Sequence, residues 1–144
     1  MTDTETLILR RTFDAPPERV FRAWTDPVER ARWDCPQEGW TTRVLEMDVR
    51  VGGTYRVAFG PPGEEPYLES GEYREVTRPT RLVFAYSVSR HGTVLQRTVC
   101  TIELTDLGGR TEVVITDAGM GAESHRGGWT HALDRLAAVL LGPQ

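Results

Sequence analysis

Six short segments in which apolar and polar residues alternate follow one another between residues 41 and 118. Tyr55, Val57 and Phe59 form one such set, and apolar side chains at every second position place one face of a strand against a core. Glycine and proline turns separate the segments, as at Gly52-Gly53. Six successive strands joined by short turns predict an antiparallel meander.

A further strand and two short helices are predicted ahead of the meander. Leu7, Leu9 and Phe13 alternate with polar residues and indicate the first strand. Proline is tolerated in the first turn of a helix because its missing N–H would have no partner there. Pro16-Pro17 and Pro27 therefore each open a short helix, and together the two helices form an elbow.

Both helices of the elbow are expected to pack through an apolar stripe. The stripe of the first helix consists of Val20, Phe21 and Trp24. That of the second helix consists of Val28, Ala31 and Trp33. Because none of these side chains is titratable, we interpret the elbow as a structural plug and lid rather than as a catalytic element.

The chain ends in a longer amphipathic helix. Its apolar stripe, at spacings of 4, 3 and 4, consists of Trp129, Leu133, Leu136 and Leu140. Such a stripe must be buried, and the concave face of the sheet is the available surface. Two interpretations of Gly127-Gly128 stay open. These glycines belong to a loop or irregular first turn before a helix that begins near Trp129, or they clear space for a ligand.

Length and composition exclude several classes of protein. A chain of 144 residues is the usual size of one domain, here residues 1–144. The net charge is −4 and the arginines are scattered, so nucleic acid is not an expected partner.

The apolar run at 136–141 is too short to insert into a membrane, and no signal peptide is recognisable, so we expect a cytoplasmic protein. All 17 basic residues are arginine, which excludes a Schiff-base lysine and suggests a GC-rich bacterial genome.

Residues that could carry metal or nucleophilic chemistry do not cluster in the sequence. The histidines and cysteines stand in five unrelated contexts, so neither a metal nor a cofactor is expected: His91, His125, His131, Cys35 and Cys100. Ser124-His125 with Asp117 suggests a catalytic triad, but neighbours on a helix point about 100° apart and should not hydrogen-bond to each other. We therefore expect no triad.

Three further side chains, those of Arg11, Cys35 and Cys100, need separate interpretation. Arg11 has the same phase as Leu9 and Phe13, so it should face inward and pair with a carboxylate, or lie at the sheet edge; binding of a ligand anion is an alternative role. Cys35 follows Asp34, whose charge disfavours a thiolate, and Cys100 should be a small buried hydrophobe. A disulfide between the two cysteines is not expected.

The order of the predicted elements resembles the helix-grip fold of the SRPBCC superfamily, also called START-like or Bet v 1-like, which includes pollen allergens, polyketide cyclases and lipid-transfer domains. Five motifs are similar, in order, to those of its bacterial branch named after the C-terminal domain of the activator of Hsp90 ATPase: RTFDAPPERVFRAWTDPVERARW, RVGGTYRV, SGEYREVTRPTRLVF, GGRTEVVIT and GGWTHALDRLAAVL. Where that branch often has two adjacent tryptophans and a glycine before a proline, this chain has Trp33-Asp34-Cys35-Pro36.

The resemblance implies an α+β fold with a cavity. A seven-stranded curved antiparallel sheet would wrap around the long C-terminal helix, with the two short helices after the first strand. The apolar cavity would lie between sheet and helix, and amphipathic aromatic rings suit such a pocket. The candidate ligand-binding residues are Trp24, Trp33, Trp40, Phe59, Tyr73, Phe84, Tyr86, Cys100, His125, Gly128, Trp129 and Leu133.

We expect from these features a non-enzymatic protein that binds a small hydrophobic molecule in the cavity. Two alternatives stay open. One is a co-chaperone-like protein interaction in a stress response, through a surface rather than the cavity. The other is a cyclase- or hydrolase-type enzyme that uses Tyr73, Tyr86 or His125 as acid or base. A homodimer through a sheet edge, at the first or the third strand, is also expected to be possible.

Overall fold

The computed structural model describes residues 5–141. Its elements, in chain order, are β1 (Glu5–Phe13), α1 (Pro17–Thr25), α2 (Pro27–Trp33), β2 (Thr41–Met47), β3 (Thr54–Gly60), β4 (Tyr67–Thr77), β5 (Arg81–Arg90), β6 (Thr93–Asp106), β7 (Thr111–Met120), the single 3₁₀ turn η1 (Glu123–His125) and α3 (Arg126–Leu141). The two ends of the expected domain, residues 1–4 and 142–144, lie outside the described residues.

All seven strands form one antiparallel sheet in the order β1-β7-β6-β5-β4-β3-β2. From β2 to β7 each strand pairs with the next one in the chain, so the predicted meander is confirmed. β1 joins the far side by pairing with β7. The edges are therefore β1 and β2. The expectation of an edge at the third strand was wrong, because β3 pairs with β2 on one side and with β4 on the other.

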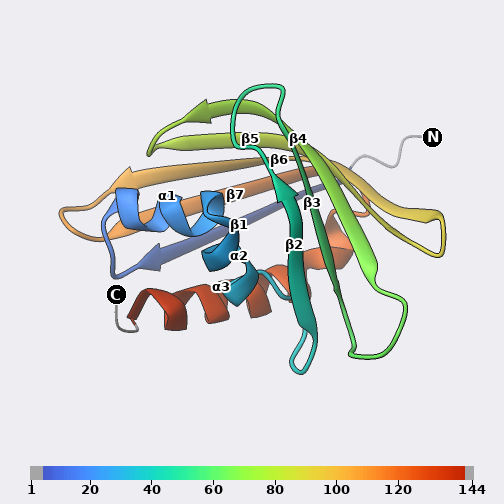
Figure 1. Cartoon of the computed structure of the whole chain (residues 1–144). Helices are drawn as coiled ribbons and strands as arrows, with labels where there is room; N and C mark the ends of the chain where they lie inside the picture. Colours follow the sequence, from blue (N-terminus) through green and yellow to red (C-terminus); the bar gives the residue numbers. More distant parts are fainter. Residues whose placement is uncertain (1–4, 142–144) are drawn as a thin grey trace.

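The sheet curves around α3, and α1 and α2 lie on the same side of the sheet as α3 (Figure 1). This arrangement is the expected α+β helix-grip fold. No helix among residues 5–141 is long and apolar enough to cross a membrane.

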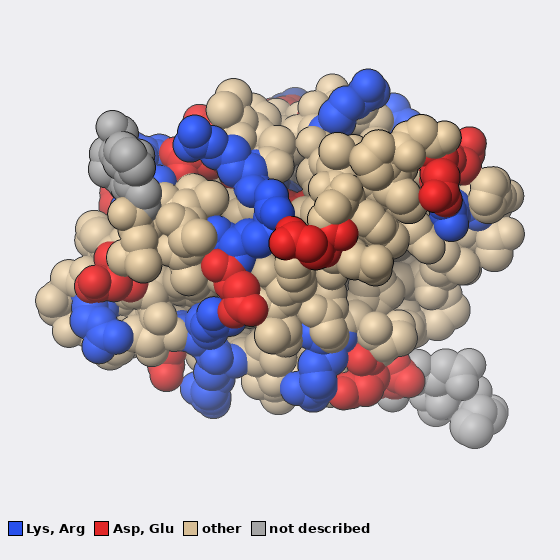
Figure 2. Space-filling model, turned by 90° about the horizontal axis from the view of Figure 1, so that it is seen from below, with Lys and Arg blue, Asp and Glu red and all other residues tan. Residues whose placement is uncertain are grey.

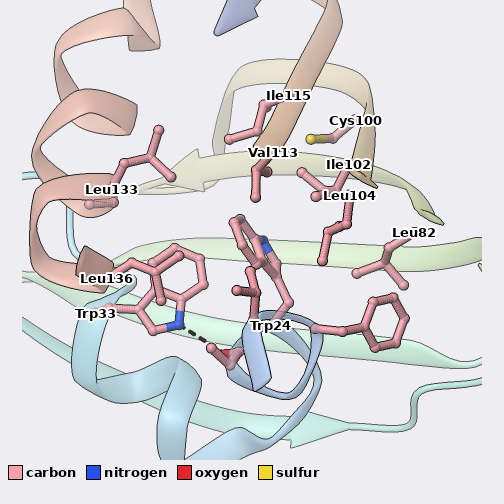
Figure 3. Packing of buried hydrophobic residues seen from close by; sticks show 14 of the residues in the cluster. Trp24, Trp33, Leu82, Cys100, Ile102, Leu104, Val113, Ile115, Leu133 and Leu136 are labelled. Carbon is pink, nitrogen blue, oxygen red and sulfur yellow. Dashed lines mark hydrogen bonds between the residues drawn. The ribbon is translucent and has the colours of Figure 1, made fainter. Parts of the chain in front are cut away.

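The apolar stripe of α3 packs into the core as the sequence indicates. Leu133 and Leu136 are buried and lie close to the tryptophans of the elbow, opposite the apolar side chains of the sheet (Figure 3). The rings of Trp24 and Trp33 meet edge to face, with centroids 4.8 Å apart. The Trp33 indole N–H donates to the carbonyl oxygen of Ala23 at 2.9 Å and so joins the two helices of the elbow. Arg19 and Arg22 of α1 also donate to Glu29 of α2.

The predicted stripe of α2 was wrong at Val28, which is 72% exposed. Asp26 caps this helix by accepting from the backbone N–H groups of Val28 and Glu29, and this cap fixes where the first turn begins. With that starting point the inward face carries Trp33 and, one turn earlier, Arg30, which is only 3% exposed. A charged residue therefore occupies a position that the apolar pattern did not reveal.

The outer face of α3 carries basic and acidic groups side by side (Figure 2). Arg11 of β1 donates to Asp134 of α3 at 2.5 Å, so the expected pairing of Arg11 with a carboxylate is confirmed. Arg135 donates to the carbonyl oxygen of Arg32 on α2 at 3.0 Å. These contacts connect α3 to the first strand and to the elbow.

Burial of the α3 stripe should be a main source of stability. We expect Leu136→Ala to lower the free energy of unfolding by about 3 kcal/mol, because Leu136 is fully buried and the truncation leaves a cavity. Leu141→Ala is the matched control on the same helix, since Leu141 is 70% exposed, and should change stability by less than about 0.5 kcal/mol. Urea unfolding checks both values, and equal losses would contradict this packing.

Candidate functional site

A cavity of about 410 Å³ lies between the concave face of the sheet and the first half of α3. Its wall consists of strands β3 to β6, helices α1 and α2, the segment that follows α2, and residues 124–132. Nine of the candidate residues line it: Trp24, Trp33, Trp40, Phe59, Phe84, Tyr86, His125, Gly128 and Trp129. Eight of its twenty lining residues carry aromatic rings and seven are polar or charged, and the volume is typical of small-molecule pockets.

Three candidate residues, Tyr73, Cys100 and Leu133, are buried in the core and do not line the cavity. The Tyr55 ring packs beside Tyr73, with ring centroids 5.4 Å apart. Burial raises the pKa of the Cys100 thiol well above its ordinary value, and the nearby Asp117 carboxyl adds to the rise. Cys100 is therefore a buried, protonated side chain, as expected for a small hydrophobe.

One side of the cavity wall carries a charged cluster that the sequence analysis missed. The Arg30 guanidinium donates from Nε to Asp34 at 2.9 Å and from Nη2 to Glu69 at 3.3 Å. Its plane stacks on the Tyr55 ring, with Cζ 4.6 Å from the ring centroid. The Tyr55 hydroxyl donates to Glu69 at 2.5 Å. This cluster joins α2, β3 and β4 at the cavity.

Burial is also the main influence on the titration of this cluster. It raises the pKa of Glu69 to about 7, and the negative charge of Asp34 adds to the rise. The positive charge of Arg30 and the hydrogen bond from Tyr55 act in the opposite direction. The pKa of the Tyr55 hydroxyl is likewise raised well above its ordinary value, chiefly by burial. Glu69 can therefore exchange a proton near neutral pH.

A second polar cluster lies around the buried Asp117 of β7. Its Oδ2 atom accepts from the Tyr86 hydroxyl at 2.7 Å, the Trp129 indole N–H at 3.2 Å and the Gln96 amide at 3.4 Å. Gln96 also donates to the Tyr86 hydroxyl at 2.9 Å. Tyr86, Gln96 and Trp129 line the cavity, so this cluster fixes the orientation of three side chains in its wall.

Stacked aromatic rings form another part of the wall. The Trp40 ring stacks on Tyr67 with centroids 5.5 Å apart, and Tyr67 stacks on Phe59 at 5.5 Å. Arg90 also lies over the Tyr67 ring, with its Cζ 4.5 Å from the ring centroid. These rings offer flat apolar surface to a ligand.

The Ser124–His125 pair differs from expectation. The two side chains do hydrogen-bond, with Ser124 Oγ 3.2 Å from His125 Nδ1. This contact is possible because the segment is a 3₁₀ turn rather than an α-helix. However, Ser124 donates to the carbonyl oxygen of Gly121 at 2.7 Å, and His125 Nδ1 lies 3.1 Å from the same oxygen. Asp117 bonds to other groups. The pair therefore caps a turn, and it lacks the arrangement of a nucleophile and its base.

The segment after α2 separates the acid and the thiol that the sequence places together. Asp34 lines the cavity and pairs with Arg30. Cys35 is buried, and its thiol lies 3.2 Å from the carbonyl oxygen of Gln37, within its own loop. Both cysteines are free. Within residues 5–141, no group of three or more histidine, cysteine or acidic side chains could hold a metal ion.

The two glycines lie inside the first turn of α3, which begins at Arg126. The interpretation that the helix begins near Trp129 was therefore wrong. A Cβ atom on Gly128 would lie 3.0 Å from the Cβ of Pro36, whereas one on Gly127 would meet no atom within 4 Å. Gly128 thus permits the close approach of α3 to the segment after α2, at the cavity.

Two cavity residues could have been found from strand alternation. Glu69 has the same phase as Tyr67 and Tyr73, and Gln96 has the same phase as Cys100. Both were passed over because a polar residue is usually assigned to the solvent face. Arg30 had no such signal beyond its spacing of three from Trp33.

The fold and sequence are similar to those of known proteins. The family model for Activator of Hsp90 ATPase homolog 1-like protein matches residues 14–141. A crystal structure of a protein from Chromobacterium violaceum is 33% identical, covering 96% of this chain and 99% of its own, with a TM-score of 0.82. A solution structure of a protein from Arthrobacter aurescens is 25% identical over 96% of this chain and 87% of its own, with a TM-score of 0.85. No curated protein matches the chain significantly. The resemblance inferred from the sequence motifs is confirmed.

The contact between Gly128 and Pro36 can be tested with a matched pair of variants. We expect Gly127→Ala to stabilise the protein by about 1 kcal/mol, because alanine is the better helix former and its Cβ meets open space. Gly128→Ala should gain clearly less, since Pro36 would have to move. Urea unfolding measures both free energies. Equal gains would show that α3 does not approach Pro36 this closely.

Proposed function

Because the chain belongs to the Activator of Hsp90 ATPase homolog 1-like family, whose helix-grip fold is of a ligand-binding type, we propose that it binds a small hydrophobic molecule without transforming it. The ligand would occupy the cavity between the sheet and α3. The observation that carries this proposal is a volume of about 410 Å³ whose wall contains eight aromatic rings. The nine candidate residues in that wall are the proposed contacts.

Apolar burial would drive the binding. Withdrawing roughly 300 Å² of ligand surface and a similar area of cavity wall from water, at about 25 cal/mol per Å², gives about 15 kcal/mol before the costs of association. Those costs remove roughly half of this. A dissociation constant on the order of 10 μM is then expected for a well-fitting aromatic molecule.

The two alternatives expected from the sequence remain less supported. For an enzyme, Tyr86 and His125 are at the cavity, but Tyr86 donates to Asp117 and His125 caps a turn. For a co-chaperone-like interaction, no feature of the described residues singles out a docking surface. Hydrophobic-ligand binding uses the observed cavity directly, and we therefore prefer it.

Binding can be tested with N-phenyl-1-naphthylamine, a neutral probe that fluoresces in apolar surroundings. We expect saturable enhancement at one site per chain. Ala132→Phe should weaken the affinity at least tenfold, because Ala132 is a buried residue of the cavity wall and the larger ring would fill the space. Ala138→Phe is the matched control on the exposed face of α3 and should bind normally.

Two results would contradict the proposal. The first is no enhancement in the parent protein, for this probe and for a panel of aromatic and fatty compounds followed by native mass spectrometry. The second is equal binding by Ala132→Phe and Ala138→Phe, with both variants folded by circular dichroism, which would locate the bound probe outside the cavity.

A further inference from the structure

Glu69 is one of two carboxyl groups in the cavity wall, together with Asp34, and it lies among aromatic rings such as Phe84. It pairs in register with Val57 of β3 and Val88 of β5, on the concave side of the sheet. Its side chain is only 13% exposed, and it lines the cavity. Burying an acid in such surroundings is unfavourable unless hydrogen bonds compensate, so the position calls for a physical explanation.

The two carboxyl oxygens of Glu69 have different surroundings. Oε2 accepts from the Tyr55 hydroxyl at 2.5 Å and from Arg30 Nη2 at 3.3 Å. Nothing within residues 5–141 donates to Oε1. Arg30 Nη1 is fully buried and has no hydrogen-bond partner, whereas Glu69 Oε1 is not among the fully buried atoms without a partner. Oε1 is therefore the oxygen that is open to the cavity.

This asymmetry decides where a proton can reside. Because Oε2 already accepts from two donors, a proton on the carboxyl group belongs on Oε1. The neutral acid then presents an O–H donor to the cavity, whereas the carboxylate presents an acceptor. The polarity of this point in the wall is set by the protonation state of Glu69.

Several charged or titratable groups influence that state. Those that face Glu69 from the surrounding elements are Arg30 and Asp34 at α2, Tyr55 on β3, Tyr73 on β4, Tyr86 on β5, Cys100 on β6 and Asp117 on β7. His125 in η1 lines the same cavity. Burial is the largest influence and raises the pKa of Glu69 to about 7. Both forms are therefore populated at neutral pH, and the acid dominates below it.

We propose that Glu69 selects ligands with an uncharged oxygen acceptor, such as a ketone or ester carbonyl, by donating a hydrogen bond from an Oε1–H group to that oxygen. The inference rests on the proposed binding of a hydrophobic molecule and specifies its polar group. With Glu69 neutral, the charges of Arg30 and Asp34 balance, and an uncharged ligand keeps them balanced. A ligand carboxylate would instead add an unpaired negative charge beside Asp34.

The sign of the pH dependence follows from the same geometry. A carbonyl oxygen accepts from the acid but would face the lone pairs of the carboxylate. With a pKa of about 7, the neutral fraction falls about tenfold from pH 6 to pH 8. The advantage of a carbonyl ligand over a hydrocarbon of the same shape should therefore fall by up to about tenfold over that range.

The test compares 2-acetylnaphthalene with 2-isopropenylnaphthalene, in which a CH₂ group replaces the carbonyl oxygen. Neither probe changes its charge between pH 6 and pH 8. Isothermal titration calorimetry at both pH values gives the ratio of the two dissociation constants. We expect the acetyl probe to bind at least fivefold more tightly at pH 6, and to lose most of this preference at pH 8.

Glu69→Gln is the matched variant. Its carbonyl oxygen can still accept from Tyr55 and Arg30, and its NH₂ group is a donor that does not titrate. We expect this variant to keep the acetyl preference at both pH values. If Glu69→Gln does not fold, Tyr55→Phe decides, because it removes a hydrogen bond that lowers the pKa of Glu69 and should move the loss of preference to higher pH.

The outcomes distinguish a failure of the proposed binding function from a failure of the proposed role of Glu69. Failure of both probes to bind would overturn the proposed function itself. Binding of both without an acetyl preference at pH 6 would overturn only the role of Glu69. A preference that still falls with pH in Glu69→Gln would assign the titration to another group, such as His125, and would also overturn it.

Discussion

The buried guanidinium of Arg30 is the constraint on which the candidate site depends. A charge that is only 3% exposed needs partners. The Arg30 guanidinium donates to Asp34 at the end of its own helix and to Glu69 on the sheet. These contacts hold α2 against β4 and so fix the position of the elbow. They also leave Glu69 in the cavity wall, where burial and Asp34 raise its pKa to about 7.

A glycine in the sheet supports the same cluster. Gly71 pairs in register with Tyr55, and a Cβ atom there would lie 2.1 Å from Tyr55 Cε2. The absent side chain lets the Tyr55 ring lie over β4, with Arg30 on its face and its hydroxyl on Glu69. The polar part of the cavity therefore depends on packing inside the sheet as well as on charge.

The sequence predicted the fold well because its signals are local. Alternation marked the strands, Pro27 marked the elbow, and the stripe through Leu136 marked the last helix. The aromatic part of the cavity was expected from the family resemblance together with the aromatic residues on these elements. The ionic part did not, because the pairing of Arg30 with Glu69 joins residues 39 positions apart and depends on how the elbow meets the sheet. The apolar pattern placed Val28 on the buried face of α2, but in the capped helix Val28 faces solvent.

The most direct test of this account is the titration of Glu69 itself. The carboxyl carbon resonance of Glu69 can be followed by NMR from pH 3 to pH 9 in protein labelled with ¹³C-glutamate, and assigned by its loss in Glu69→Gln. The account expects a midpoint at about 7, with a further rise when 2-acetylnaphthalene is bound. A midpoint near 4.5, the ordinary value for glutamate, would show that Glu69 is a solvated carboxylate and would contradict the buried cluster.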